Sequence, residues 1–194
     1  INMIAIIKYN AGNATSVYNA VTRLGFEAVI TDDFETIQQA DKVIFPGVGE
    51  ASSAMAYLKE KGFDQVIKNL KQPTLGICLG QQLMCAYSEE GNVDCLGIFP
   101  IQVKLFPPTE IVPHMGWNTI SNLKSDLFTK VEEDSDIYYV HSFYCELSEF
   151  TIAKTNYILN YSAALHKDNF YATQFHPEKS ARIGEQILKN FLEL

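Results

Sequence analysis

The chain has 194 residues, the size of one domain with a substantial hydrophobic core. Hydrophobic residues make up 47% and charged residues 20%, a balance typical of a soluble globular protein, and the net charge of -8 argues against a protein that binds nucleic acid through its phosphates. No apolar run is long enough to cross a membrane, and none is placed at the N-terminus as a signal peptide.

The first half of the chain alternates short apolar runs with amphipathic segments. The expected strands are residues 3–8, 27–31, 42–45 and 74–77. One helix is expected to place Val17, Val21 and Leu24 on one face, a second carries Met55 and Leu58, and a third covers residues 79–87. Short strands alternating with such helices predict a mainly parallel sheet with helices on both faces.

The second half is richer in strand-like segments, and prolines interrupt the stretch from residue 97 to 120. Further strands are expected at residues 137–145, 152–155, 157–165 and 170–175, with a hairpin turn at residues 168–169 and a final helix over residues 180–194. Together these elements predict a single α/β domain over residues 1–194, with a smaller antiparallel region beside the parallel sheet.

The four cysteines are Cys78, Cys85, Cys95 and Cys145. No two of them have C-x-x-C spacing, which argues against a zinc ribbon or a redox dithiol. We expect a protein of the reduced cytosol, where a catalytic thiol stays usable. Met3 is expected to be the natural first residue, with Ile1 and Asn2 left over from expression.

One of these cysteines, Cys78, lies in a G-x-C-x-G pattern at residues 76–80, directly after an expected strand. Glycines on both sides allow a sharp strand-to-helix turn that exposes the thiol at the carboxyl edge of the sheet. The start of the helix would stabilise a thiolate, and the N–H of Leu79 would be one donor of an oxyanion hole. On this pattern alone, a small buried cysteine in an ordinary turn is an equally good interpretation.

A second polar motif, His176-Pro177-Glu178, follows the alternating run that ends at residue 175. Residues i and i+2 of an extended segment face the same way, so His176 and Glu178 can both point toward the sheet edge. The histidine would serve as a base for Cys78 and the carboxylate would orient it, which is the arrangement used in acyl transfer. A proline-containing corner with a surface carboxylate is the competing interpretation.

The segment Pro46-Gly47-Val48-Gly49 ends an expected strand and precedes a helix. Its glycines allow close backbone approach to a ligand, so Val48 or Gly49 could donate the second N–H of the oxyanion hole. Taken alone, an ordinary turn explains this segment better. His114 and His141 can be loop or core residues, and no pair of histidines has metal-ligand spacing, so we expect no metal site and no cofactor.

Taken together, these motifs resemble those of the class I, triad-type glutamine amidotransferases, and among them the glutaminase subunits that serve a cyclase in histidine biosynthesis. The resemblance covers essentially the whole chain. The matching segments are residues 9–13, 46–49, 78–83, 88–91, 113–118, 139–143 and 176–180. The segment from His114 to Asn118 is the most specific to this subfamily, because the triad alone identifies only the superfamily.

The resemblance implies that Cys78 attacks the side-chain amide of glutamine, that a glutamyl thioester forms as ammonia leaves, and that water activated by His176 releases glutamate. A carboxylate suits the substrate's α-ammonium group, which makes Glu90 a candidate for that contact. The residues that match glutamine-binding positions are Gly47, Gln82, Glu90, His141, Ser142 and Phe143.

The same resemblance implies a partner, a (β/α)₈-barrel cyclase subunit that receives the ammonia through a protected channel. The cyclase product would be imidazole glycerol phosphate, together with an aminoimidazole carboxamide ribonucleotide. Binding of the partner and its nucleotide is expected to complete the oxyanion hole at the Val48–Gly49 peptide, as a gating step. The residues that match the subunit contact are Asn13, Trp117, Asn118 and Lys179, with a core role for Trp117 as the alternative.

One position departs from the family pattern, because Lys8 stands where an aspartate is usual. This departure leaves the triad unchanged but alters the charge beside the loop that carries Asn13. It motivates a second hypothesis, in which a related glutaminase feeds a different acceptor, such as an enzyme of sugar or glycan amidation. Two further hypotheses are a γ-glutamyl peptidase and a catalytically idle interaction protein.

Overall fold

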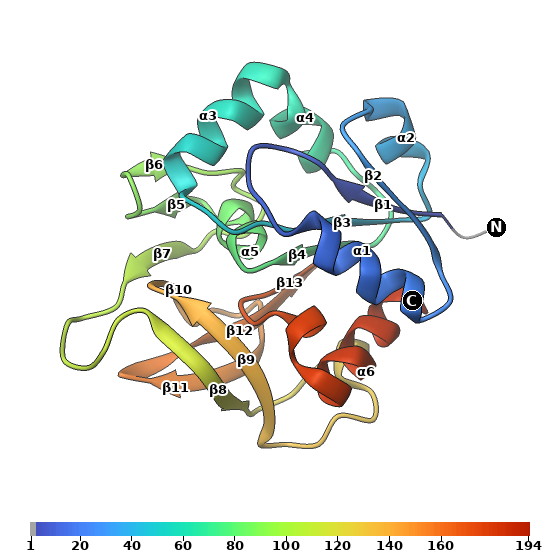
Figure 1. Ribbon diagram of the computed structural model, residues 1–194. Coiled ribbons are helices and arrows are strands. Elements are labelled where there is room, and N and C mark those ends of the chain that lie inside the picture. The colour runs from blue at the N-terminus through green and yellow to red at the C-terminus, as the bar shows by residue number, and fades with distance from the viewer. Residues whose placement is uncertain (1–2) are drawn as a thin grey trace.

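The computed structural model describes residues 3–194, so the expectation for Ile1 and Asn2 lies outside the described residues. A seven-stranded sheet forms the centre, in the order β11-β12-β13-β4-β3-β1-β2 (Figure 1). Its five parallel strands are β1 (Met3–Ile7), β2 (Glu27–Thr31), β3 (Lys42–Phe45), β4 (Thr74–Ile77) and β13 (Phe170–Thr173). Two antiparallel strands extend one side, β11 (Thr151–Tyr157) and β12 (Leu159–Lys167).

Helices cover both faces of this sheet, as the sequence predicts. One face packs against α1 (Ala14–Arg23) and α6 (Ala181–Leu192). The other packs against α2 (Phe34–Gln39), α3 (Ala51–Lys61), α4 (Phe63–Lys68) and α5 (Leu79–Met84). Successive residues of β1 show the division, because Ile4 and Ile6 are buried in the first core and Ala5 and Ile7 in the second. The α/β fold class is therefore confirmed.

Two smaller sheets flank the carboxyl end of the central one. The first joins β5 (Tyr87–Ser88), β6 (Val93–Asp94), β7 (Gln102–Leu105) and β10 (Phe143–Cys145). The second pairs β8 (His114–Ile120) with β9 (Ser135–His141). Two short 3₁₀ turns, η1 (Asp126–Phe128) and η2 (Pro177–Lys179), complete the elements. Among residues 3–194, every helix falls short of the length and apolar character that crossing a membrane requires.

Several predicted boundaries were wrong, each for a local reason. The strand predicted at residues 137–145 breaks at Ser142, because β9 and β10 pair in different sheets. The helix predicted at residues 79–87 ends at Met84, since Cys85 is extended and leads into β5. The short helices α2 and α4 were not predicted, while the turn predicted at residues 168–169 is confirmed, with Asp168 at φ 53° between β12 and β13.

The turn between β4 and α5 depends on close packing of backbone against backbone. A Cβ atom added to Gly80 would lie 2.0 Å from the carbonyl oxygen of Phe45 on β3. This oxygen belongs to the sheet and cannot move aside without shifting the strand. Any side chain at position 80 would therefore push α5, and with it the thiol of Cys78, away from the sheet.

We expect Gly80→Ala to lower the thermal midpoint of unfolding by about 10 °C, because overpacking against a rigid backbone costs about 3 kcal/mol. Differential scanning calorimetry measures this shift. Gly12→Ala is the matched control, since its Cβ would meet only the Cγ2 of Val48, at an ordinary 3.5 Å. Equal stability of the two variants would show that α5 is not held by this contact.

Candidate active site

The thiol of Cys78 sits on a strained turn at the carboxyl edge of the central sheet. Cys78 lies between β4 and α5 with φ 55° and ψ -109°, a backbone conformation that residues other than glycine rarely adopt. Its N–H donates to the carbonyl oxygen of Thr173 at the end of β13, 2.8 Å away. This bond ties the turn to the strand that leads to His176, so the sheet itself sets the spacing between the two motifs.

The His176 and Glu178 side chains meet as the sequence predicts. The Nδ1 atom of His176 lies 2.8 Å from Oε1 of Glu178, and both side chains are fully buried. The Nε2 atom of His176 has no hydrogen-bonded partner among the described residues, which leaves it available to act on the thiol. Asn13 also approaches Nδ1, with its Nδ2 atom 3.4 Å away.

The protonation of His176 is controlled by its neighbours. Burial disfavours the imidazolium, but the adjacent Cys78 sulfur and the Glu178 carboxylate outweigh burial and raise the pKa of His176 to about 10. A buried imidazolium beside a carboxylate and a thiolate is the state expected after the proton of Cys78 has moved to His176. The group can therefore hold a proton at neutral pH and deliver it to a leaving group.

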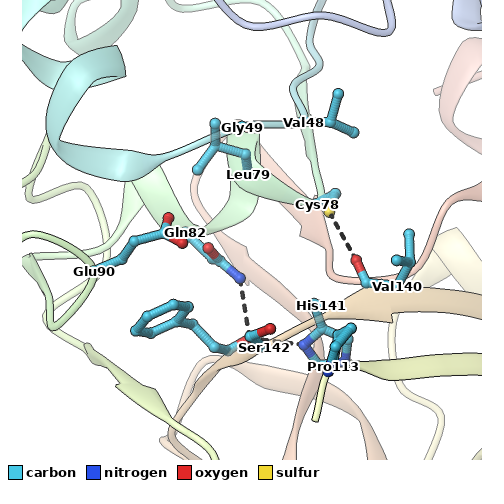
Figure 2. Close-up of a pocket in the computed structure, with 11 residues that line it drawn as sticks. Val48, Gly49, Cys78, Leu79, Gln82, Glu90, Pro113, Val140, His141 and Ser142 are labelled. Atoms are coloured by element: carbon cyan, nitrogen blue, oxygen red, sulfur yellow. Dashed lines mark hydrogen bonds between the residues drawn. The ribbon is translucent and has the colours of Figure 1, made fainter.

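A cavity of about 300 Å³ opens over the thiol (Figure 2). Val48, Gly49 and Leu79 form one side, and Val140 and His141 form the opposite side. The full lining is Val48, Gly49, Cys78, Leu79, Gln82, Glu90, Pro113, Val140, His141, Ser142 and Phe143. Of the predicted glutamine-binding residues, all except Gly47 line this cavity, and the carbonyl oxygen of Gly47 accepts a hydrogen bond from the N–H of Leu79.

Two polar side chains of the cavity have distinct partners. Oε1 of Glu90 accepts a hydrogen bond from the N–H of Ala51 at the start of α3, 2.8 Å away. Burial raises the pKa of Glu90, and the bond from Ala51 partly opposes that rise. Gln82 uses its Nε2 atom to donate to the carbonyl oxygen of Phe143 and to Oε1 of Gln174. Gln174 was not predicted as a site residue.

Of the expected oxyanion donors, Leu79 already has a hydrogen-bond partner in this structure. The N–H of Leu79 donates to the carbonyl oxygen of Gly47, 3.1 Å away. Because a trans peptide points its C=O and N–H in opposite directions, the N–H of Val48 faces away from Leu79. The neighbouring carbonyl of Val48 accepts from the N–H of Gly12 at 3.3 Å. The Gly47–Val48 peptide therefore presents its carbonyl oxygen, rather than its N–H, to Leu79.

His141, which lines the cavity, and His114 form a buried cluster rather than lying in a loop. His141 donates from Nδ1 to the carbonyl oxygen of Phe143 at 2.7 Å, so its Nε2 is free to accept from Tyr161 at 3.2 Å. His114 stacks on Tyr157 with ring centroids 4.0 Å apart. Burial lowers the pKa of His114 to about 4 and that of His141 to about 3.

These shifts predict a loss of stability in acid. In the unfolded chain both histidines titrate near pH 6.5, whereas the folded protein keeps them neutral down to about pH 4 and about pH 3. The stabilisation is present above pH 6.5 and is lost as the pH falls toward those values. Between pH 7 and pH 5, each histidine is expected to lower the free energy of unfolding by about 2 kcal/mol. Urea unfolding at pH 7, 6 and 5 measures this slope, and His114→Phe should reduce it.

The residues predicted to contact the partner differ in exposure. Trp117 is 55% exposed on β8, which contradicts a core role for this residue. Lys179 is exposed on η2, and Asn13 is partly buried beside His176. Asn118 donates to the carbonyl oxygen of Asn156, 2.9 Å away.

Comparison with known proteins places this fold and site in a class. The family model for class-I glutamine amidotransferases matches residues 5–194. The solved structure of PurLQS from Thermotoga maritima aligns with a TM-score of 0.73 at 16% identity, covering 98% of this chain and 97% of the other. A glutamine amidotransferase from the same organism aligns with a TM-score of 0.63 at 14% identity, covering 98% and 82%. Both likenesses concern the fold alone. The chain belongs to the class I glutamine amidotransferases, and it is therefore an enzyme.

Close relatives narrow the class further. An imidazole glycerol phosphate synthase subunit HisH from Bacteroides fragilis is 66% identical, with 98% of this chain and 99% of the relative covered. The protein of the same name from Bacteroides thetaiotaomicron is 61% identical over the same shares. A third, from Haemophilus influenzae, is 45% identical over 98% of this chain and 96% of its own. Within the class, the chain falls among the HisH subunits of imidazole glycerol phosphate synthase.

Proposed function

We propose that this chain hydrolyses L-glutamine to glutamate and ammonia, and that a cyclase subunit uses the ammonia to make imidazole glycerol phosphate in histidine biosynthesis. One observation carries the chemistry. Cys78, on a strained turn, lines a cavity, and the buried His176–Glu178 pair lies beside this cysteine. The HisH relatives support the pathway, because their identity extends over the full length of this chain.

The reaction follows from the roles of the triad. His176 takes the thiol proton, and the Cys78 thiolate attacks the carbonyl carbon of the substrate's side-chain amide. The tetrahedral intermediate collapses as its C–N bond breaks, with His176 returning the proton to the departing nitrogen. Water, deprotonated by His176, then attacks the thioester, and the C–S bond breaks to give glutamate and regenerate the thiol.

The cavity offers complementary groups to the amino-acid end of glutamine. Because both hydrogens of the Gln82 amide nitrogen are used internally, only its Oε1 is left for the substrate, as an acceptor. That oxygen and the Glu90 carboxylate would both favour the α-ammonium group. Backbone N–H groups would bind the α-carboxylate. The cavity volume of about 300 Å³ suits a ligand of this size.

The blocked oxyanion hole suggests how idle hydrolysis is limited. In the present conformation the Gly47 carbonyl occupies the N–H of Leu79, so charge on the tetrahedral intermediate would find no donor there. Rotation of the Gly47–Val48 peptide would free Leu79 and bring the Val48 N–H into the site. We propose that binding of the partner and its nucleotide drives this rotation, so that glutamine is used only when an acceptor is present.

The proposed partner is a (β/α)₈-barrel cyclase that docks through Asn13, Trp117, Asn118 and Lys179. An exposed tryptophan is the type of residue that dominates such interfaces. Lys8 is exposed just beyond β1 and is not among the cavity-lining residues, which fits a change at the subunit boundary rather than in the triad.

The origin of the transferred nitrogen tests this proposal. The chain and the cyclase of the same organism are supplied with glutamine labelled with ¹⁵N at its amide, in the presence of excess unlabelled ammonium. Channelled ammonia predicts that the imidazole product carries ¹⁵N. Product labelled only in proportion to the bulk ammonium would contradict channelling. In a separate experiment, Trp117→Ala should lower the affinity of the chain for the cyclase by at least about tenfold, which would weaken co-elution of the two proteins.

A further inference from the structure

Gln174 is a buried residue whose amide lies against the nucleophile. It follows the last residue of β13 and precedes His176 by two positions. Its side chain is fully buried, and its backbone N–H donates to the carbonyl oxygen of Ala163 at 2.8 Å. It is not among the residues that line the cavity, so it approaches Cys78 from the protein side.

The orientation of the Gln174 amide is determined by a chain of hydrogen bonds that begins at a backbone carbonyl. The oxygen of Phe143 can only accept, so Gln82 must present its Nε2 atom to it, at 3.0 Å. The same Nε2 atom then donates to Oε1 of Gln174 at 2.9 Å. Gln174 is left with its Nε2 atom toward Cys78, where it donates to the sulfur at 3.6 Å.

We propose that Gln174 is a positioning residue that holds the Cys78 sulfur in place and stabilises it as a thiolate, with Gln82 fixing the direction of its amide. This rests on the proposed function, in which Cys78 is the nucleophile. A thiolate accepts hydrogen bonds only, and accepts them more strongly than a neutral thiol. Gln174 therefore stabilises the charge that remains on sulfur once His176 has taken the proton.

Other groups also face the sulfur, and a Gln174 variant leaves them unchanged. His176, with Glu178 behind it, lies on one side, and Tyr9 is close enough for the charge of Cys78 to raise its pKa further, in addition to the effect of burial. Glu90 and His141 line the same cavity. A change in the reactivity of Cys78 in the variant is thus attributable to the lost donor.

The pH dependence of Cys78 alkylation by iodoacetamide tests this role without requiring turnover. In Gln174→Met, which keeps the side-chain volume, we expect the midpoint of the alkylation profile to rise by about one pH unit. Below that midpoint, Cys78 would be alkylated about tenfold more slowly. Glutaminase kcat should fall by a similar factor with KM nearly unchanged, because Gln174 does not contact the substrate. Asn190→Leu is the control. It also removes a buried amide, because Asn190 on α6 donates to the carbonyl oxygens of Leu127 and Thr129, 2.9 and 2.7 Å away.

The same alkylation profile in Gln174→Met and in the unaltered chain would overturn the proposal, and Gln174 would then be a packing residue. If Gln174→Met does not fold, Gln82→Met provides the second test, because it frees the Gln174 amide to rotate. A midpoint raised in the same direction supports the proposal, and an unmoved midpoint contradicts it. Failure of the proposed function is distinguishable, since the unaltered chain would then keep its activity after complete alkylation of Cys78.

Discussion

Cys78→Ser is expected to lower glutaminase activity by at least about 10⁴-fold while leaving the fold intact. A hydroxyl gives up its proton far less readily than a thiol, and His176 is arranged to stabilise a charged sulfur. The change is nearly isosteric at a position that is 6% exposed, so little packing is lost. Glutamate release in the presence of the partner cyclase measures the effect, and circular dichroism reports the fold.

Cys95→Ser is the matched control for this substitution. Cys95 is partly buried, its Sγ atom contacts the carbonyl oxygen of Val93, and it lies outside the cavity. We expect its activity to equal that of the unaltered chain. Retained activity in Cys78→Ser, or equal loss in both variants, would refute the assignment of Cys78 as the nucleophile.

Glu178→Gln is expected to lower activity by about 10³-fold, because the carboxylate both orients His176 and stabilises its protonated form. Glu178 contributes to the raised pKa of His176, so removal of its charge lowers that pKa from about 10. The imidazolium is the acid that protonates the departing nitrogen. The alkaline limb of the activity profile should therefore move to lower pH in the variant.

A pH-activity profile from pH 6 to pH 10.5 checks both parts of this prediction. Glu185→Gln is the matched control. It removes the same charge from an exposed residue of α6 that does not line the cavity. We expect its profile to be unchanged. An alkaline limb at the same pH in Glu178→Gln and in the unaltered chain would show that Glu178 does not control the protonation of His176.

The central part of the fold was predictable because its patterns are local. Apolar strands that end in glycine-rich turns identified β1, β3 and β4, and the amphipathic spacing of Val17 and Val21 identified α1. Short elements carried too little periodicity, so α2 and α4 were missed. The break at Ser142 depends on which sheet each half of the segment joins, and that choice is made by tertiary packing rather than by the segment itself.

For the site, the residues of the proposed triad and most of the cavity lining were accessible from sequence, whereas the hydrogen bonds behind them were not. Cys78, His176 and Glu178 stand in motifs with a distinct spacing, and the fold brings them together. The role of Gln174 depends on a path through Gln82 to a carbonyl on β10, which no local pattern contains. The orientation of the Gly47–Val48 peptide was likewise not predictable, because a single backbone rotation reverses it and the residue types do not determine which orientation is adopted.

The most direct test of the account is glutamate release by this chain, measured alone and with the histidine-pathway cyclase of the same organism loaded with its nucleotide ligand. Because the Gly47 carbonyl occupies the Leu79 N–H in the isolated chain, we predict slow hydrolysis alone and strong stimulation in the loaded complex. Full activity in the isolated chain would contradict the blocked oxyanion hole. No stimulation of a folded chain whose Cys78 is alkylatable would contradict the proposed partner.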